Sequence, residues 1–250
     1  MNLDPADPLA VAVVGAIRAG DLHGLRRLLA THPGLATAWL GDDRPGAMTR
    51  TLLHVATDWP GHFPNGPATV ALLAEAGAEV DARFGGGSHD ETPLHWAASS
   101  DDVEVLDALL DLGADIEAPG AVIAGGTPLT DARAFGQWRA AHRLVERGAK
   151  TTIDDAATLG LQDRLEAYFA GTAPAPDEVT RAFWGACHGG QRACAEYLLE
   201  RGADPNWIPP WEPLTPLDAA ARSGADDLVA WLRTQGAKPA KELPGGQGLA

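Results

Sequence analysis

The sequence predicts an all-α solenoid of about seven helix-pair units with short hairpin or loop tips, and two repeated phrases carry this prediction. The first phrase is Gly-Ala, which occurs at 77–78, 113–114, 148–149, 202–203 and 236–237, at intervals of 36, 35, 54 and 34 residues. The second is Thr-Pro-Leu or a close variant, and it begins at Thr51, Thr92, Thr127 and Thr215. The composition is 45% hydrophobic, which is enough apolar material for a continuous core.

Each phrase marks one end of a helix. In the second phrase Thr92 can cap a helix N-terminus. Pro93 fits the first turn because an N–H at that position would have no intrahelical acceptor, so the N–H that proline lacks is not needed. Apolar residues at helical spacing predict a second helix over 103–112, and Gly113 ends it because glycine tolerates the left-handed conformation there. Neither helix can bury its apolar face alone, so the units are expected to stack.

These phrases resemble the ankyrin repeat, whose signature is Thr-Pro-Leu-His-x-Ala at a period of about 33 residues. The resemblance implies a soluble, stand-alone array of the bacterial type that forms a single domain over 1–238, followed by a flexible tail over 239–250. The expected cap spans 7–40, and the units begin near residues 51, 92, 127, 151, 180 and 215. Three segments depart from the repeat pattern: an insertion at 59–67, an irregular unit at 151–169 with almost no room for a hairpin before it, and an enlarged tip at 119–126. The tip at 205–214 is enlarged as well.

Charge and cysteine content exclude several classes of function. Nineteen Lys and Arg against 34 Asp and Glu give a net charge of −15, so nucleic acid and anionic membrane surfaces are not expected partners. Cys187 and Cys194 fit neither a disulfide framework nor a Cys-x-x-Cys metal pair, which favours a reducing cytoplasm. The sequence lacks the phosphate-loop and His-Glu-x-x-His motifs, and we expect no metal site and no cofactor.

A candidate site follows from aligning the units. The resemblance implies a concave groove lined by the first helices and the tips, and the column after the histidine of each phrase places Asp131 and Asp155 between Trp96 and Trp184. Two carboxylates on neighbouring units could flank a small ligand. Other candidate binding residues surround this column. Asp58 and Ser99 lie three residues further along in their units, and Trp59 and His62 belong to the insertion. His188 lies one helical turn after Trp184, and Trp207 and Trp211 belong to the tip at 205–214.

Some of these residues also have a structural interpretation. Asp131 and Asp155 fall in first helical turns, where a carboxylate favours the positive end of the helix dipole. His54 and His95 belong to the repeated phrase, and the resemblance implies that they form hydrogen bonds between adjacent repeats.

Two functions remain open from the sequence. In the first, the groove binds a segment of a partner protein, with tryptophans as anchors and aspartates selecting a basic segment. In the second, the protein is an enzyme or a binding protein for a cationic or amine-like small molecule, with Asp131 and Asp155 as the catalytic acid and base in a roofed pocket. An open groove would favour the partner, and a closed cavity around the two aspartates would favour the small molecule.

Overall fold

The computed structural model describes residues 1–42, 44, 47–87 and 89–243, and it contains fourteen α-helices within them. The chain divides into two compact units, Met1–Lys150 and Thr151–Ala250. The predicted flexible tail is described only as far as residue 243, including a short 3-10 turn, η2 (Ala240–Glu242), and its remainder at 244–250 lies outside the described residues.

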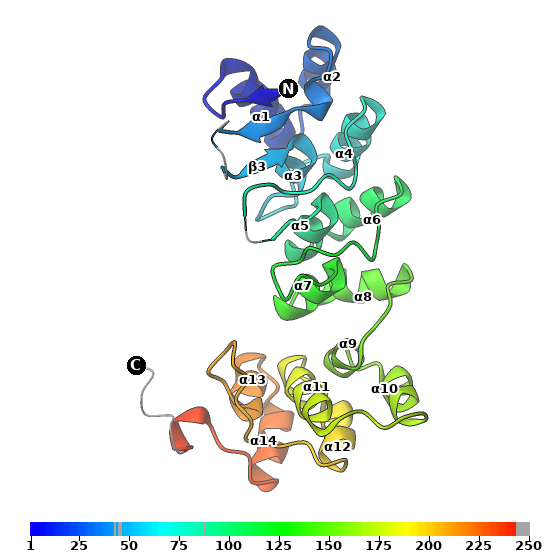
Figure 1. Cartoon of the computed structure of the whole chain (residues 1–250), viewed down its shortest axis with the longest axis vertical. Coiled ribbons are helices and arrows are strands. Elements are labelled where there is room, and N and C mark those ends of the chain that lie inside the picture. Colours follow the sequence, from blue (N-terminus) through cyan, green and yellow to red (C-terminus); the bar gives the residue numbers. More distant parts are fainter. Residues whose placement is uncertain (43, 45–46, 88, 244–250) are drawn as a thin grey trace. The chain divides into compact units, whose positions relative to one another are not determined.

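The first unit consists of four helix pairs that follow one another in chain order (Figure 1). The first helices of successive pairs pack on each other, and so do the second helices, which buries the apolar stripe that each helix leaves exposed within its own pair. The helices are α1 (Pro8–Ala19), α2 (Leu22–Thr31), α3 (Leu52–Thr57), α4 (Gly66–Glu75), α5 (Pro93–Ser99), α6 (Val103–Asp111), α7 (Pro128–Ala134) and α8 (Trp138–Glu146).

A small three-stranded sheet adds to the helices of the first unit. Strand β1 (Asn2–Leu3) pairs in parallel with β2 (Trp39–Gly41), which pairs antiparallel with β3 (Thr49–Thr51). The all-α prediction did not include this sheet. After α2 and a short 3-10 turn, η1 (Leu35–Thr37), the chain runs extended as β2 and returns as β3 to the start of α3, so the backbone groups of the two strands pair with each other.

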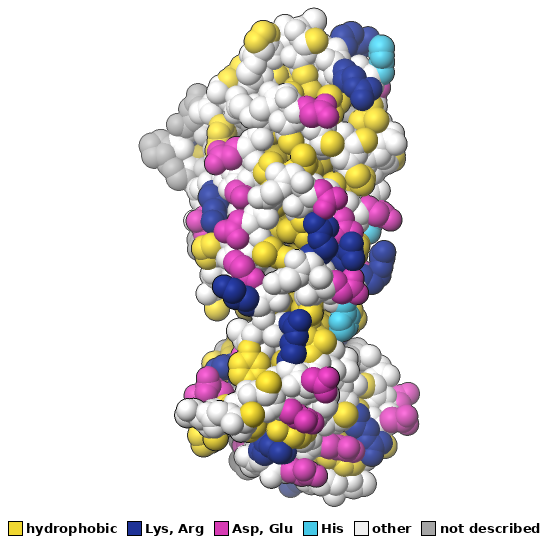
Figure 2. All heavy atoms as spheres, turned by 90° about the vertical axis from the view of Figure 1, so that its right-hand side faces the viewer, with side chains coloured by type: hydrophobic (Ala, Val, Ile, Leu, Met, Phe, Trp, Pro, Cys, Tyr) yellow, Lys and Arg dark blue, Asp and Glu magenta, His cyan; other side chains and the backbone are white. Residues whose placement is uncertain are grey.

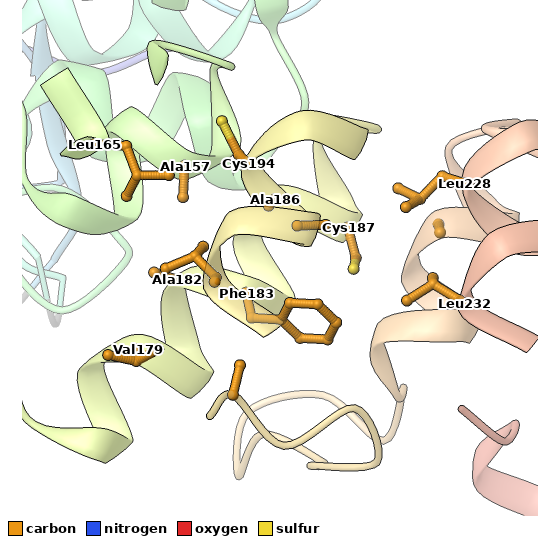
Figure 3. Close-up of a cluster of buried hydrophobic side chains, with 14 of the residues drawn as sticks. Ala157, Leu165, Val179, Ala182, Phe183, Ala186, Cys187, Cys194, Leu228 and Leu232 are labelled. Carbon is orange, nitrogen blue, oxygen red and sulfur yellow. The ribbon is translucent and has the colours of Figure 1, made fainter. Parts of the chain in front are cut away.

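The second unit contains three helix pairs in its described residues. Their apolar side chains form one hydrophobic core (Figure 3). Phe183 lies at its centre and is fully buried, with Leu228 and Leu232 among the apolar side chains of the same core. The helices are α9 (Ile153–Thr158), α10 (Gln162–Phe169), α11 (Pro176–His188), α12 (Arg192–Leu199), α13 (Pro216–Arg222) and α14 (Asp226–Thr234).

Most first helices begin where the repeated phrase predicts. Threonine is the N-cap in five of them, at positions 51, 92, 127, 152 and 215. Helix α11 differs, because it begins at Pro176 and Thr180 lies inside it. Pro176 occupies the first turn and the Glu178 carboxylate accepts the N–H of Ala175 at 2.9 Å, so these residues start the helix one turn earlier than predicted.

The surface mixes both signs of charge. In Figure 2 basic and acidic side chains alternate on the visible face and do not gather into one basic patch. An ion-pair network joins α6 and α8, where Arg143 and Arg147 both contact Asp107, at 2.8 and 2.6 Å. No helix in the described part of the chain has the length and apolar character needed to cross a membrane.

Candidate functional site

Four of the predicted binding residues come together in the second unit. Trp184 and His188 lie on α11 with their rings stacked at 5.5 Å between centroids. Trp207 and Trp211 come from the enlarged tip at 205–214. The ring of Trp211 lies edge-on to that of Trp184, with centroids 6.1 Å apart, and edge-on to that of Trp207, with centroids 5.6 Å apart. We call these four residues the tryptophan cluster.

Hydrogen bonds fix the inner part of the tryptophan cluster. The indole N–H of Trp184 donates to the carbonyl of Leu214 at 2.9 Å. A guanidinium nitrogen of Arg222 lies 3.3 Å from Nδ1 of His188, and Arg222 also forms an ion pair with Glu212. Trp184 is only 6% exposed, whereas Trp211 is 58% exposed. The cluster therefore has a buried, hydrogen-bonded inner ring, Trp184, and an outer ring, Trp211, that is open to solvent.

The first unit has a separate groove with a cavity volume of about 640 Å³. Trp96 on α5 and Phe84 form an aromatic wall with ring centroids 5.5 Å apart. The other lining residues come from the N-terminal segment, α1, β2 and the chain that leads into and includes β3: Pro5, Val11, Val14, Gly15, Arg18, Leu40, Gly41, Met48 and Arg50. Of these lining residues, Trp96 is one that the column alignment placed in the groove.

Asp58 lies at the end of α3, and its carboxylate is held in two ion pairs. Its Oδ2 contacts Arg18 at 3.2 Å and Arg50 at 3.0 Å. Because both arginines also line the 640 Å³ groove, the charged part of this groove is an Arg–Asp–Arg network.

Asp131 is fully buried in the first unit, and its neighbouring carboxyl group is Glu91. The enlarged tip at 119–126 covers it, and the N–H of Ile123 donates to Asp131 Oδ1 at 3.3 Å. Burial is the largest of the effects that together raise the pKa of Asp131 to about 7; the charge of Glu91 also raises it, while the hydrogen bond from Ile123 acts in the opposite direction.

Glu91 is held between two aromatic side chains. His89 Nδ1 lies 2.9 Å from Glu91 Oε2, and His89 and Trp96 both act to lower the pKa of Glu91. Burial is the larger effect and raises that pKa. Two adjacent carboxyl groups in a buried site favour the state in which they hold one proton between them.

Asp155 has a different role from the one that the column alignment gave it. It is the third residue of α9, and its Oδ2 accepts the backbone N–H of Thr152 at 2.8 Å and the Thr152 hydroxyl at 2.7 Å. Asp218 makes the same two bonds to Thr215 at the start of α13, at 3.2 and 2.9 Å. Asp155 therefore occupies the place of His95 in its repeat, and the position that corresponds to Trp96 is Ala156.

The contacts of each aspartate differ from those that the column alignment predicted. Asp131 is buried beside Glu91, Asp155 bonds to the N-cap of its own helix, and neither residue lines the 640 Å³ groove. Both α7 and α9 have a threonine N-cap. The third helical residue, which bonds back to that threonine, is Thr130 in α7 and Asp155 in α9. The one-residue difference arises because α9 follows Thr152 and not Thr151.

The insertion residues lie apart from the aromatic wall of the groove. Trp59 is 77% exposed, and the N–H of His62 donates to the Asp102 carboxylate at 2.6 Å. Ser99 is half-buried, and no residue in the described part of the chain hydrogen-bonds to its hydroxyl oxygen.

The phrase histidines do connect neighbouring repeats, as predicted. His54 Nε2 lies 3.1 Å from the carbonyl of Glu91, and His95 Nε2 lies 3.4 Å from the carbonyl of Gly126. Burial lowers the pKa of both histidines to about 4, so they are neutral at pH 7.

Sequence reasoning missed Glu91, His89 and Phe84. Glu91 directly precedes the Thr92 phrase, and its position next to a helix start was the one signal that could have drawn attention to it. The three residues share a tip before α5, where no helical periodicity predicts which side chains turn inward.

Comparison with known proteins gives one family and several relatives. Residues 13–120 match a family model of ankyrin repeats in three copies. Palmitoyltransferase AKR1 of Kluyveromyces lactis is 36% identical over 109 residues, which are 44% of this chain and 13% of that protein. Two ankyrin repeat and KH domain-containing proteins are also similar: one of Caenorhabditis briggsae, 32% identical over 68% of this chain, and mask-1 of Caenorhabditis elegans, 28% identical over 63%. This chain spans only 7% and 6% of the length of those two proteins.

Proposed function

Because this chain is an ankyrin-repeat protein, and ankyrin repeats generally mediate protein–protein binding, we propose that it binds a segment of a partner protein through the tryptophan cluster. The observation that carries the proposal is the exposure of Trp211, which is 58% accessible while its ring contacts Trp184 and Trp207. Exposed apolar side chains supported by a fixed aromatic base are typical of binding hot spots.

The chemistry of the cluster favours a segment with both basic and apolar residues. An indole face attracts Lys and Arg side chains and also packs against apolar ones. The net charge of −15 would attract a basic segment over a distance and increase the rate of encounter.

A small-molecule function is the second candidate, and the groove of the first unit is the observation that favours it. Its volume of about 640 Å³ lies within the range of roughly 300–1,000 Å³ that is usual for ligand sites. Arg18 and Arg50 at this groove disfavour the cationic ligand that the sequence suggested. Asp131 has a pKa suited to proton transfer, but its side chain is fully buried, so we propose binding rather than acid–base catalysis.

We place this function in the cytoplasm as part of the same proposal. Cys187 and Cys194 are both buried free thiols, and burial raises the pKa of each, to about 11 for Cys194. Buried thiols of this kind are unreactive and suit a reducing compartment.

A displayed random-peptide library would test the proposal on the full chain. We expect selection of peptides that combine basic and apolar residues, and we expect Trp211→Ala to weaken their binding at least tenfold. Trp59→Ala is the matched control because Trp59 is also an exposed tryptophan, at 77%, but lies in the other unit.

Two outcomes would overturn the proposal. One is that no peptide family is enriched by the parent protein. The other is that Trp211→Ala and Trp59→Ala bind the selected peptides with the affinity of the parent chain.

A further inference from the structure

The insertion at 59–67 brings a histidine to the start of a neighbouring helix. His62 lies between α3 and α4, yet its contacts are with the N-terminus of α6, where Asp102 is the N-cap. The backbone N–H of His62 donates to Asp102 Oδ2 at 2.6 Å, and its Nδ1 lies 3.9 Å from Asp102 Oδ1. Glu104 follows two residues after Asp102 in the first turn of α6.

The hydrogen bonds of His62 assign its proton. Nε2 lies 3.2 Å from the carbonyl oxygen of Ser100, which can only accept, so Nε2 carries the hydrogen. In the neutral ring Nδ1 then has a lone pair, and this lone pair is on the side of Asp102. One ligand atom from each of His62, Asp102 and Glu104 lies within 4.8 Å of the other two.

In the neutral form of the His62 ring, an imidazole lone pair faces two carboxylates, and a cation bound between them would remove their mutual repulsion. Asp102 is 1% exposed and its oxygens accept two backbone N–H groups, from His62 and from Val105 at 3.3 Å, so its position is fixed. Each carboxylate oxygen keeps a second lone pair that can bind a metal.

We propose that His62, Asp102 and Glu104 form a site for a divalent transition metal of the Zn²⁺ class, which joins the insertion to the start of α6. Imidazole with carboxylates is a donor set that suits Zn²⁺. The Ser100 carbonyl holds the imidazole through Nε2–H, as outer partners of metal-bound histidines commonly do. Ligand atoms around Zn²⁺ are roughly 3–3.5 Å apart, and the exposed side chains of His62 and Glu104 can close this distance around the fixed Asp102.

This site differs from the expectation of no metal that the sequence gave, and it does not depend on partner binding. The sequence offered no signal for it because His62 and the two carboxylates are about 40 residues apart in the chain. Three protein ligands leave at least one coordination position for water.

Calorimetric titration of the full chain with Zn²⁺ tests the proposal. We expect one saturable site in the parent protein, and at least tenfold weaker binding in His62→Asn and in Glu104→Gln. Asparagine is chosen because His62 has a positive φ of 56°, which asparagine tolerates. The matched controls are His142→Asn and Glu79→Gln, which make the same changes at exposed positions outside the site and should bind Zn²⁺ like the parent.

A second readout uses the parent protein alone. In ¹⁵N spectra of the histidine rings, Zn²⁺ should shift Nδ1 of His62 and leave its Nε2 protonated. Binding that is equal in the parent, His62→Asn and Glu104→Gln would overturn the proposal. So would an unshifted His62 ring at saturating Zn²⁺, or a preference for Mg²⁺ or Ca²⁺ over Zn²⁺.

Discussion

At the residue scale, the two aspartates that the sequence treated as a pair behave in opposite ways. Asp155 is the third residue of its helix and accepts two hydrogen bonds from Thr152, so it caps the start of α9. Asp131 is the fourth residue of its helix and lies buried beside Glu91, so its charged form is disfavoured. One position along the helix decides whether the carboxylate caps the backbone or enters the interior.

Replacement of Asp131 by asparagine should stabilise the protein at neutral pH. The pKa of Asp131 is about 7 in the folded protein and about 3.9 in an unfolded chain, so the folded state binds more protons between these values. The free energy of unfolding therefore decreases as pH rises from about 4 to about 7. At pH 7.5 Asp131→Asn removes the cost of a buried charge, and each kcal/mol gained in the free energy of unfolding should raise the midpoint of thermal unfolding by roughly 2–4 °C. Near pH 4 the substitution should have little effect. A decrease at pH 7.5 would contradict this account.

Replacement of Asp155 by alanine should have the opposite effect. The change removes the acceptor for Thr152 N–H and should cost about 1 kcal/mol in the free energy of unfolding. Asp218→Ala should cost a similar amount because Asp218 has the same geometry toward Thr215. Urea unfolding of both variants measures this, and a stabilised Asp155→Ala protein would show that the cap is not its main role.

At the element scale, the inserted loop at 59–67 contacts elements on both sides of its own repeat. Asn65 donates its side-chain N–H to the carbonyl of Gly20 at 2.9 Å, and the N–H of His62 donates to Asp102 at 2.6 Å. Gly20 ends α1 in the left-handed conformation, with φ of 62°. The loop is therefore a packing element between α1 and α6.

Glycine substitutions can measure this packing. A Cβ on Gly20 would lie 2.1 Å from the carbonyl oxygen of Pro64, whereas a Cβ on Gly77 would meet nothing within 4 Å. Both glycines have positive φ, so alanine strains the backbone at either position. We expect Gly20→Ala to lower the midpoint of thermal unfolding clearly more than Gly77→Ala, and equal losses would argue against tight packing of the loop.

The histidine at the start of α5 should produce an acid-sensitive element. Burial lowers the pKa of His95 to about 4, below the value of about 6.5 in an unfolded chain, so unfolding takes up a proton between these values. The free energy of unfolding should therefore fall as pH drops from about 6.5 to about 4. Urea unfolding at pH 7.5 and pH 5 tests this, with His32→Asn as the control at an exposed position. His95→Asn should have a lower free energy of unfolding than the control at pH 7.5, and that free energy should fall less than the control's between pH 7.5 and pH 5. Equal acid losses in the two variants would contradict the assignment.

At the scale of the whole molecule, the excess of acidic residues is the main electrostatic feature. Opposite charges pair locally, as between Arg143 and Asp107 at 2.8 Å, but the net charge remains −15. Such a field acts on the rate of encounter with a basic partner more than on the stability of the complex.

Salt should therefore slow association of a selected basic peptide. We expect the association rate to fall roughly tenfold between low and high ionic strength in stopped-flow fluorescence, because the screening length shrinks. Trp211→Ala should raise the dissociation rate while the salt dependence of association stays the same. A salt-independent association rate would show that the net charge has no part in binding.

The sequence by itself determined the repeat architecture, because the capping threonines, the first-turn prolines and the terminal glycines act within a few residues of each other. It also identified the four residues of the tryptophan cluster, but not their mutual contacts. Only the tertiary structure decided that Asp131 faces Glu91, that Asp155 caps α9 and that His62 reaches Asp102. These contacts join residues through tips and an insertion whose paths depend on the neighbouring repeats, and no local periodicity encodes them.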